Sequence, residues 1–193
     1  MKSWIPTVAL TTSYLLGLLF VTSTGSSATA LAADDNQKMQ SSPEDFKEFC
    51  QAMKGRWIGE VIWITDWPGF GKKGDKVTTY VEWTIGEGGK VLLGRFYGGP
   101  GSATFMAHYD ARARQIKDRW VSSGGNVWNH LVYKKDGEWH YHTTGSTGDG
   151  QEITGSSIRH LSDDGKTQRW MGLWKIDGKA LDPLRDIYRR IGD

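Results

Sequence analysis

The chain has 193 residues, of which 38% are hydrophobic and 24% charged, a balance typical of one globular domain. A formal net charge of +2 argues against strong binding to nucleic acid, and a single cysteine, Cys50, excludes an internal disulfide framework. Ten tryptophans and 25 glycines, with only five prolines, favour short strands joined by tight turns.

The N-terminal segment has the pattern of a secretory signal peptide. An apolar run at 12–21 is short for a membrane span, and residues 30–32, Ala-Leu-Ala, match the small-residue pattern of a cleavage site. We therefore expect a signal peptide over 1–32 and a secreted or periplasmic mature protein that begins at Ala33 and keeps no stable membrane anchor. Cleavage after Ala30, or retention of the segment as an anchor, are the alternatives.

A polar segment at 33–42 is expected to be flexible and leads into a short helix. Ser42 can cap that helix together with Asp45, and Pro43 suits its first position. Four apolar residues recur at helical spacing and predict a buried face: Phe46, Phe49, Cys50 and Met53. Cys50 is then a small buried hydrophobic residue, and Gly55 ends the helix.

Everything after Gly55 predicts strands. The segment KVTTYVEWTI at 76–85 alternates apolar and polar residues, and similar segments follow with turn signals every 8 to 14 residues or so. Short connections favour an antiparallel meander, and closing the sheet removes exposed edges. The predicted fold is all-β: an up-and-down antiparallel β-barrel of about ten strands with a short N-terminal helix, over residues 43–193.

The first predicted strand is apolar on both faces. Ile58, Ile62 and Ile64 have the parity opposite to Trp57. A bulge at Gly59 would turn the isoleucines inward, or the helix would cover the outer face of the strand.

The order helix, Gly55-x-Trp57, ten strands and terminal arginine resembles the lipocalins and the wider calycin superfamily. In that family the tryptophan closes one end of the barrel, and an arginine near the chain end packs against it. The resemblance implies this role for Trp57 and for Arg189 or Arg190. We favour Arg189, because it shares a strand face with two isoleucines.

The layout also resembles an uncharacterised group of secreted bacterial lipocalin-like proteins. These carry an early G-x-W-x-G, a mid-chain Y-D turn and a strand with W-x-S. The corresponding residues here are Gly55, Trp57, Gly59, Tyr109, Asp110, Trp120 and Ser122.

Three histidines on neighbouring predicted strands form the first candidate site. A three-residue turn at 135–137 would pair His130 with His142, on the same face as His140. A two-residue turn at 136–137 would instead place His130 and His142 on opposite faces. We expect the three-residue turn, because lysine and aspartate suit a type I turn before a left-handed glycine. Such a group could bind zinc, but lining of the barrel or exposure to solvent is the favoured interpretation, because no carboxylate orients it.

Tryptophans on separate strands form the second candidate site. They could converge on an apolar pocket for a small molecule, or they could fill the barrel. The predicted ligand-binding residues are Trp83, Trp120, Trp128, His130, His142 and Trp170.

The loop DWPGFGKKGD, at 66–75, stands where lipocalins carry a flap over the barrel opening. Trp67 and Phe70 could cover a ligand, while Lys72 and Lys73 could attract an anion. A solvated loop is the alternative.

The sequence contains no nucleophile, zinc-protease, CxxC or dinucleotide-binding motif. We therefore predict a secreted lipocalin-like protein that binds a small, partly apolar molecule without a cofactor and without catalysis. Three other interpretations remain open. They are a haem-binding barrel resembling the nitrobindins, with His160 as the axial candidate, a small envelope enzyme, and an interaction module with a filled core.

Overall fold

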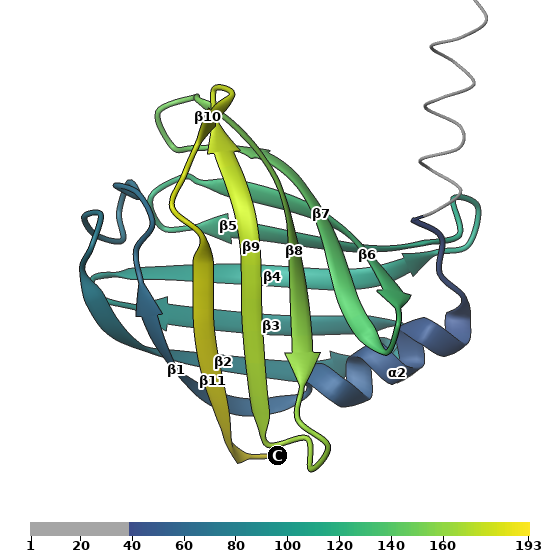
Figure 1. Ribbon diagram of the computed structural model, residues 1–193. Helices are drawn as coiled ribbons and strands as arrows, with labels where there is room; N and C mark the ends of the chain where they lie inside the picture. Colours follow the sequence, from purple (N-terminus) through teal and green to yellow (C-terminus); the bar gives the residue numbers. More distant parts are fainter. Residues whose placement is uncertain (1–38) are drawn as a thin grey trace, which may run out of the picture.

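The computed structural model describes residues 39–193, so the predicted signal peptide lies outside the described residues. The described chain is all-β, with one short helix, as predicted (Figure 1). Its elements are α2 (Pro43–Met53), β1 (Gly55–Ile62), β2 (Lys76–Gly86), the 3₁₀ helix η1 (Glu87–Gly89), β3 (Val91–Gly98), β4 (Gly101–Asp110), β5 (Gln115–Ser122), β6 (Val127–Lys135), β7 (Glu138–Ser146), β8 (Glu152–Leu161), β9 (Thr167–Ile176), β10 (Lys179–Ala180) and β11 (Leu184–Gly192).

Ten antiparallel strands close into an up-and-down barrel. Strands β1 to β9 pair in chain order, and β11 closes the barrel by pairing with both β9 and β1. The two-residue β10 pairs with β9 alone. Closure leaves none of the ten long strands as an open edge, which explains how so many short strands can form one small domain.

The helix α2 forms as its sequence predicts. The Asp45 backbone N–H donates to Ser42 Oγ (3.0 Å), and the Ser42 N–H donates back to Asp45 Oδ2 (2.8 Å). Its apolar face is buried, and the burial raises the pKa of the Cys50 thiol to about 11, so this cysteine is a packing residue.

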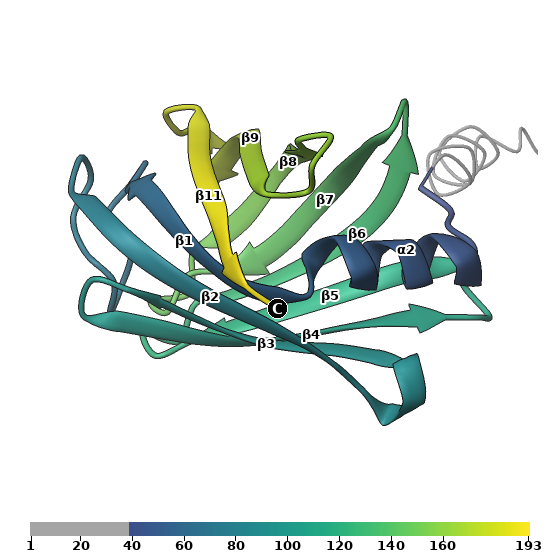
Figure 2. The ribbon, with the colours of Figure 1, turned by 90° about the horizontal axis from the view of Figure 1, so that it is seen from below.

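The helix fills one end of the barrel. Phe49 packs edge-on against the inward-facing rings of Trp83, Trp139 and Tyr141, with centroids 5.2–6.4 Å away. Figure 2 shows α2 lying within the curve of the sheet. Because this end is filled, any open space must lie toward the other end of the barrel.

Strand β1 contains no bulge at Gly59, and α2 does not cover its outer face. Its residues alternate regularly, with Trp57 and Val61 buried and Ile58 and Ile62 exposed. Gly59 pairs with Tyr188, and a Cβ at Gly59 would lie 2.4 Å from that ring. The glycine therefore makes room for the tyrosine rather than for a change of parity.

The arginine that packs on Trp57 is Arg190, so the prediction of Arg189 is wrong. Arg190 pairs with Trp57 across β1 and β11, and its guanidinium lies 4.2 Å from the centroid of the indole. Tyr188 shares its inward face, while Arg189 and Ile187 face outward. Trp57 is 1% exposed at the end of the barrel that α2 fills, as expected, and its Nε1 donates to Met53 O.

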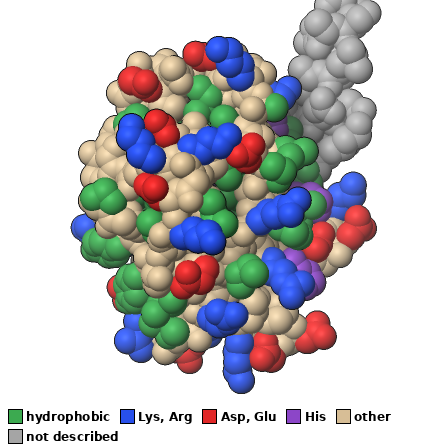
Figure 3. Space-filling model, turned by 60° about the vertical axis from the view of Figure 1, so that its left-hand side comes forward, with side chains coloured by type: hydrophobic (Ala, Val, Ile, Leu, Met, Phe, Trp, Pro, Cys, Tyr) green, Lys and Arg blue, Asp and Glu red, His purple; other side chains and the backbone are tan. Residues whose placement is uncertain are grey.

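The outer surface mixes apolar and charged side chains. Half-exposed isoleucines of β1 and β11 lie among arginines and glutamates of the same strands. Figure 3 shows this interspersion on one face. No helix within residues 39–193 is long and apolar enough to cross a membrane.

Candidate functional site: an aromatic cavity under a closed loop

The loop between β1 and β2 folds down over the barrel opening. Trp67 is 6% exposed and packs edge-on against Trp128 and Trp174, with centroids 5.4 and 6.2 Å away. Phe70 is 4% exposed and packs against Phe96 at 5.7 Å. The loop therefore acts as a lid whose aromatic side chains point into the barrel, as the flap interpretation predicts.

The fully buried Asn126 holds this lid in place. Its Nδ2 donates to Pro68 O (2.9 Å), and its Oδ1 accepts from the Gly148 N–H (2.9 Å). A Cβ at Gly124 would lie 1.7 Å from Pro68 O, so only glycine permits this approach of the two backbones.

The lid lysines pair with nearby carboxylates. Lys72 Nζ lies 3.3 Å from Asp66 Oδ2, and Lys73 Nζ lies 2.8 Å from Asp182 Oδ2. The Lys73 backbone N–H also donates to Asp66 Oδ1 (2.8 Å). The contacts with Asp66 close the loop on itself, the pair with Asp182 joins it to the segment before β11, and both give little support to the predicted attraction of an anion.

Beneath the lid lies a cavity of about 70 Å³, measured as the space open to the centre of a water molecule. One water needs roughly 10–15 Å³ on this measure, so the cavity suits a ligand of about half a dozen non-hydrogen atoms. Nine of its fifteen lining residues are Trp, Phe or Tyr, so its walls are almost wholly apolar. The lining residues are Ile62, Trp63, Ile64, Trp67, Phe70, Phe96, Ala103, Trp120, Trp128, His130, Trp170, Trp174, Leu184, Asp186 and Tyr188.

The cavity approaches the outer surface beside a seam between β1 and β11. These strands pair from Arg56 to Glu60, but not beyond the pair of Glu60 with Ile187. Past that point β1 runs into the lid, where the Trp63 N–H donates to Asp75 O and so continues the contact of β1 with the segment before β2. Ile62, which is 52% exposed, and Leu184 border both the seam and the cavity.

Three ionisable side chains line the cavity, His130, Asp186 and Tyr188, and sequence reasoning found only His130. His130 Nδ1 is 2.9 Å from Thr143 Oγ1, and burial, together with the charge of Arg159, lowers the pKa of His130 to about 3. The imidazole is therefore neutral at physiological pH. Asp186, which was not predicted, is 4% exposed, and burial raises the pKa of its carboxyl to about 7.

A buried guanidinium lies next to this cavity. The charge of Arg159 lies over the rings of Trp170 (4.5 Å) and Tyr141 (5.4 Å), and its Nη1 donates to Gln168 Oε1 (3.1 Å). Nη1 also lies 3.6 Å from Met53 Sδ of α2. Arg159 thus occupies the layer between the helix and the cavity.

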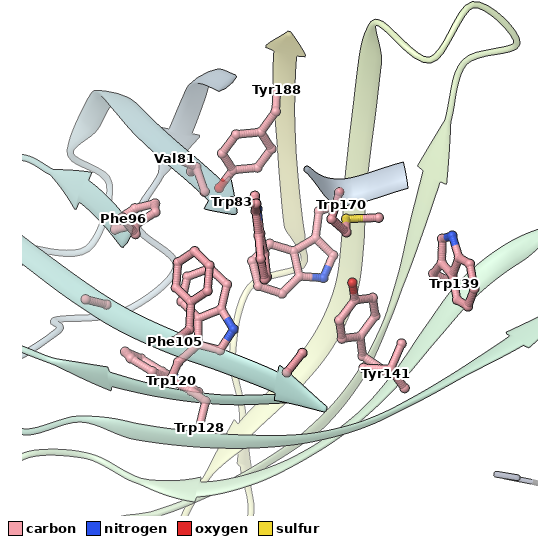
Figure 4. Close-up of a cluster of buried hydrophobic side chains, with 14 of the residues drawn as sticks. Val81, Trp83, Phe96, Phe105, Trp120, Trp128, Trp139, Tyr141, Trp170 and Tyr188 are labelled. Atoms are coloured by element: carbon pink, nitrogen blue, oxygen red, sulfur yellow. The ribbon is translucent and has the colours of Figure 1, made fainter. Parts of the chain in front are cut away.

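Three of the four predicted tryptophans meet in the cavity: Trp120, Trp128 and Trp170. Trp83 instead packs 4.0 Å from Phe105 and 6.4 Å from Phe49 of α2, on the side of the barrel that the helix fills. Figure 4 shows Trp83 among the buried aromatic side chains of the barrel. Trp120 is oriented by its Nε1, which donates to Asp118 Oδ2 (2.8 Å). Both interpretations of the tryptophans therefore hold in part, because some fill the barrel and others surround an open space.

The predicted pairing of His130 with His142 is wrong. His130 pairs with Thr143, because the turn has two residues, Asp136 and Gly137, with φ of 52° and 80°. His130 therefore points into the barrel and is 3% exposed, while His142 faces solvent. The strand face shared by three histidines does not exist, and no cluster of three or more His, Cys, Asp or Glu suited to a metal occurs within residues 39–193.

Comparison with known proteins adds little to this description. No family model matches the chain, and no curated protein matches it. Among solved structures, a crystal structure of a Bacteroides fragilis protein described as a "putative outer membrane protein" is similar. It shares 9% sequence identity with a TM-score of 0.22, covering 73% of this chain and 98% of that one.

Proposed function

We propose that this protein is a lipocalin-like binding protein, exported from the cytoplasm, that holds a small, largely apolar molecule in the cavity beneath the lid. The observation that carries the proposal is the cavity itself. It is an aromatic-walled space at the one end of the barrel that α2 does not fill. Small-molecule sites commonly combine apolar walls with a few polar groups, here His130 and Asp186.

Binding fits the polar groups of the site better than catalysis does. The neutral His130 has a threonine hydroxyl, not a carboxylate, as its Nδ1 partner, and its low pKa makes it a poor general base. The other buried carboxyl, Asp118, holds the Trp120 indole and does not line the cavity.

Two observations weigh against haem. The axial candidate His160 lies on the outer side of the barrel, where its Nδ1 is 3.3 Å from Glu138 Oε1. His130 does line the cavity, but a space of about 70 Å³ is far smaller than the macrocycle. A haem site would require the lid and several tryptophans to move.

A cavity-filling variant tests the proposal. Ala103 lines the cavity from β4, so in Ala103→Leu the added carbons should fill the space and abolish binding of fluorobenzene. Thr104→Leu is the matched control, because Thr104 is exposed on the other face of β4. Calorimetric titration measures the affinity of each variant. Equal binding of fluorobenzene by wild type and Ala103→Leu would contradict the proposed site.

A further inference from the structure

The polar end of the cavity indicates which ligands it selects. Asp186 lines the cavity, is 4% exposed, and its Oδ1 has no hydrogen-bond partner among the described residues. Buried polar groups are normally paired, so an orphan carboxyl oxygen in a cavity wall calls for an explanation. It is the only carboxyl among the fifteen lining residues, and the Tyr188 hydroxyl, which also belongs to the wall, hydrogen-bonds the carboxyl and acts to lower its pKa against the larger effect of burial.

The neighbouring charges do not satisfy this carboxyl. Arg159 is close enough to influence the pKa of Asp186, but no ion pair within 4 Å joins them among the ion pairs of residues 39–193. The Nη1 of Arg159 is engaged by Gln168 and the guanidinium lies over aromatic faces, while its Nε has no partner among the described residues. The Oδ1 of Asp186 is therefore buried beside an aromatic space without a hydrogen-bond donor among the described residues.

Unpaired hydrogen-bond donors also belong to residues of the cavity wall. Trp63, Trp128 and Trp174 line the cavity, and each has a buried indole N–H without an acceptor among the described residues. A hydroxyl group can donate to a carboxyl and accept from an N–H at once. A carboxylate ligand could not donate to Asp186 and would bring a second acid into a space with no charged donor on its wall.

From this placement we propose, building on the proposed function, that Asp186 is the polar anchor of the site. It selects small apolar molecules that carry a hydroxyl group over isosteric molecules without one and over carboxylates. Asp186 lies beside the seam between β1 and β11, so the hydroxyl of the ligand points toward the seam and its apolar part toward Trp120 and Trp128.

Phenol, fluorobenzene and benzoate test this selection. Phenol and fluorobenzene have the same number of non-hydrogen atoms, and only phenol donates a hydrogen bond. Wild type should bind phenol roughly tenfold more tightly than fluorobenzene, the factor for one buried hydrogen bond, and should bind benzoate most weakly. In Asp186→Leu the preference for phenol should disappear while fluorobenzene still binds.

Two further variants and one spectroscopic readout make the result decisive. Asp186→Asn keeps an acceptor oxygen and should retain the preference, as should Asp118→Asn, because Asp118 does not line the cavity. In wild type, the carboxyl ¹³C resonance of Asp186 should shift when phenol is added but not when fluorobenzene is added. This measurement does not depend on the folding of any variant. Equal affinity for phenol and fluorobenzene in wild type, or an unchanged preference in Asp186→Leu, would overturn the role of Asp186 alone. Failure of both molecules to bind wild type would overturn the proposed function with it.

Discussion

Replacing Arg190 with alanine should be among the most damaging changes at the helix end of the barrel. Its guanidinium stacks on Trp57, and its Nη2 donates to Ala52 O (3.1 Å) while its Nη1 donates to Lys54 O at the end of α2. Its Nε donates to Gly165 O (3.1 Å) in the turn between β8 and β9. One side chain thus joins the helix end, the first strand and a distant turn.

The expected loss follows from these contacts. The cation–π contact contributes about 0.5–2 kcal/mol. Three hydrogen bonds from a partly buried cation contribute on the order of 1 kcal/mol each, with some recovered through water in the variant. We expect Arg190→Ala to lower the free energy of unfolding by about 2–4 kcal/mol, and Trp57→Ala by about 3–5 kcal/mol. Arg190→Lys should restore part of the loss, because lysine lacks the flat face and the fork of donors.

Urea-induced unfolding, followed by tryptophan fluorescence, measures these values. Arg189→Ala is the matched control, because that neighbour is exposed on the outer face and should change stability by no more than about 0.5 kcal/mol. If Arg189→Ala proved more damaging than Arg190→Ala, the parity of β11 described above would be wrong. If neither substitution lowered the free energy of unfolding, the contacts of Arg190 with Trp57 and the helix end would contribute nothing to stability.

Three other predictions concern the buried acid, the histidines and the N-terminus. The pKa of Asp186 is raised to about 7 in the native state, so its protonation stabilises the native state at low pH. This contribution to the free energy of unfolding is lost as pH rises from about 4 to 7. The stability of Asp186→Asn relative to wild type should therefore increase over this range in melts at several pH values. Comparing these two proteins at each pH isolates the contribution of Asp186. Other ionisable side chains surround the same space and are common to both proteins: Arg159, Tyr188, Asp118, Tyr141 and His130. His130→Ala should cost about 2–4 kcal/mol and His142→Ala close to nothing in urea melts, and neither should change the affinity for zinc in a calorimetric titration. N-terminal sequencing of the exported protein should return Ala33, and a sequence starting at Met1 would contradict the signal peptide.

The fold was predictable because every level of the sequence agrees on it. The capping box at Ser42, the alternation in β2 and the regular turn signals each indicate the same helix and strands. The wrong predictions concern which face of a strand a side chain occupies, because a shift of one residue moves it to the opposite face. At the turn after β6, aspartate tolerates the left-handed conformation, so two residues suffice and His142 turns outward.

The prediction of which face of β11 points inward was wrong for a different reason. After Leu184, its inner face carries Asp186, Tyr188 and Arg190, while its outer face alternates arginines with two isoleucines. Hydrophobicity alone assigns the isoleucines to the core. Asp186 was missed for the same reason, because an acid on a strand is placed outward until the parity of that strand is known.

The inverted pattern of β11 is itself informative about the site. An unpaired buried carboxyl lowers stability, and an apolar residue at position 186 would pack in the same wall without that cost. The burial of Arg190 is offset by its contacts with the helix end and Trp57, and Tyr188 packs over Gly59. The Oδ1 of Asp186 makes no compensating hydrogen bond among the described residues. Strained or costly groups in a cavity commonly serve ligands rather than folding. Asp118 is equally buried and its Oδ1 also has no partner among the described residues, but Asp118 does not line the cavity, and its Oδ2 orients the Trp120 ring. If Asp186→Leu stabilises the protein while removing its preference for phenol, the carboxyl is kept for the ligand and not for the barrel.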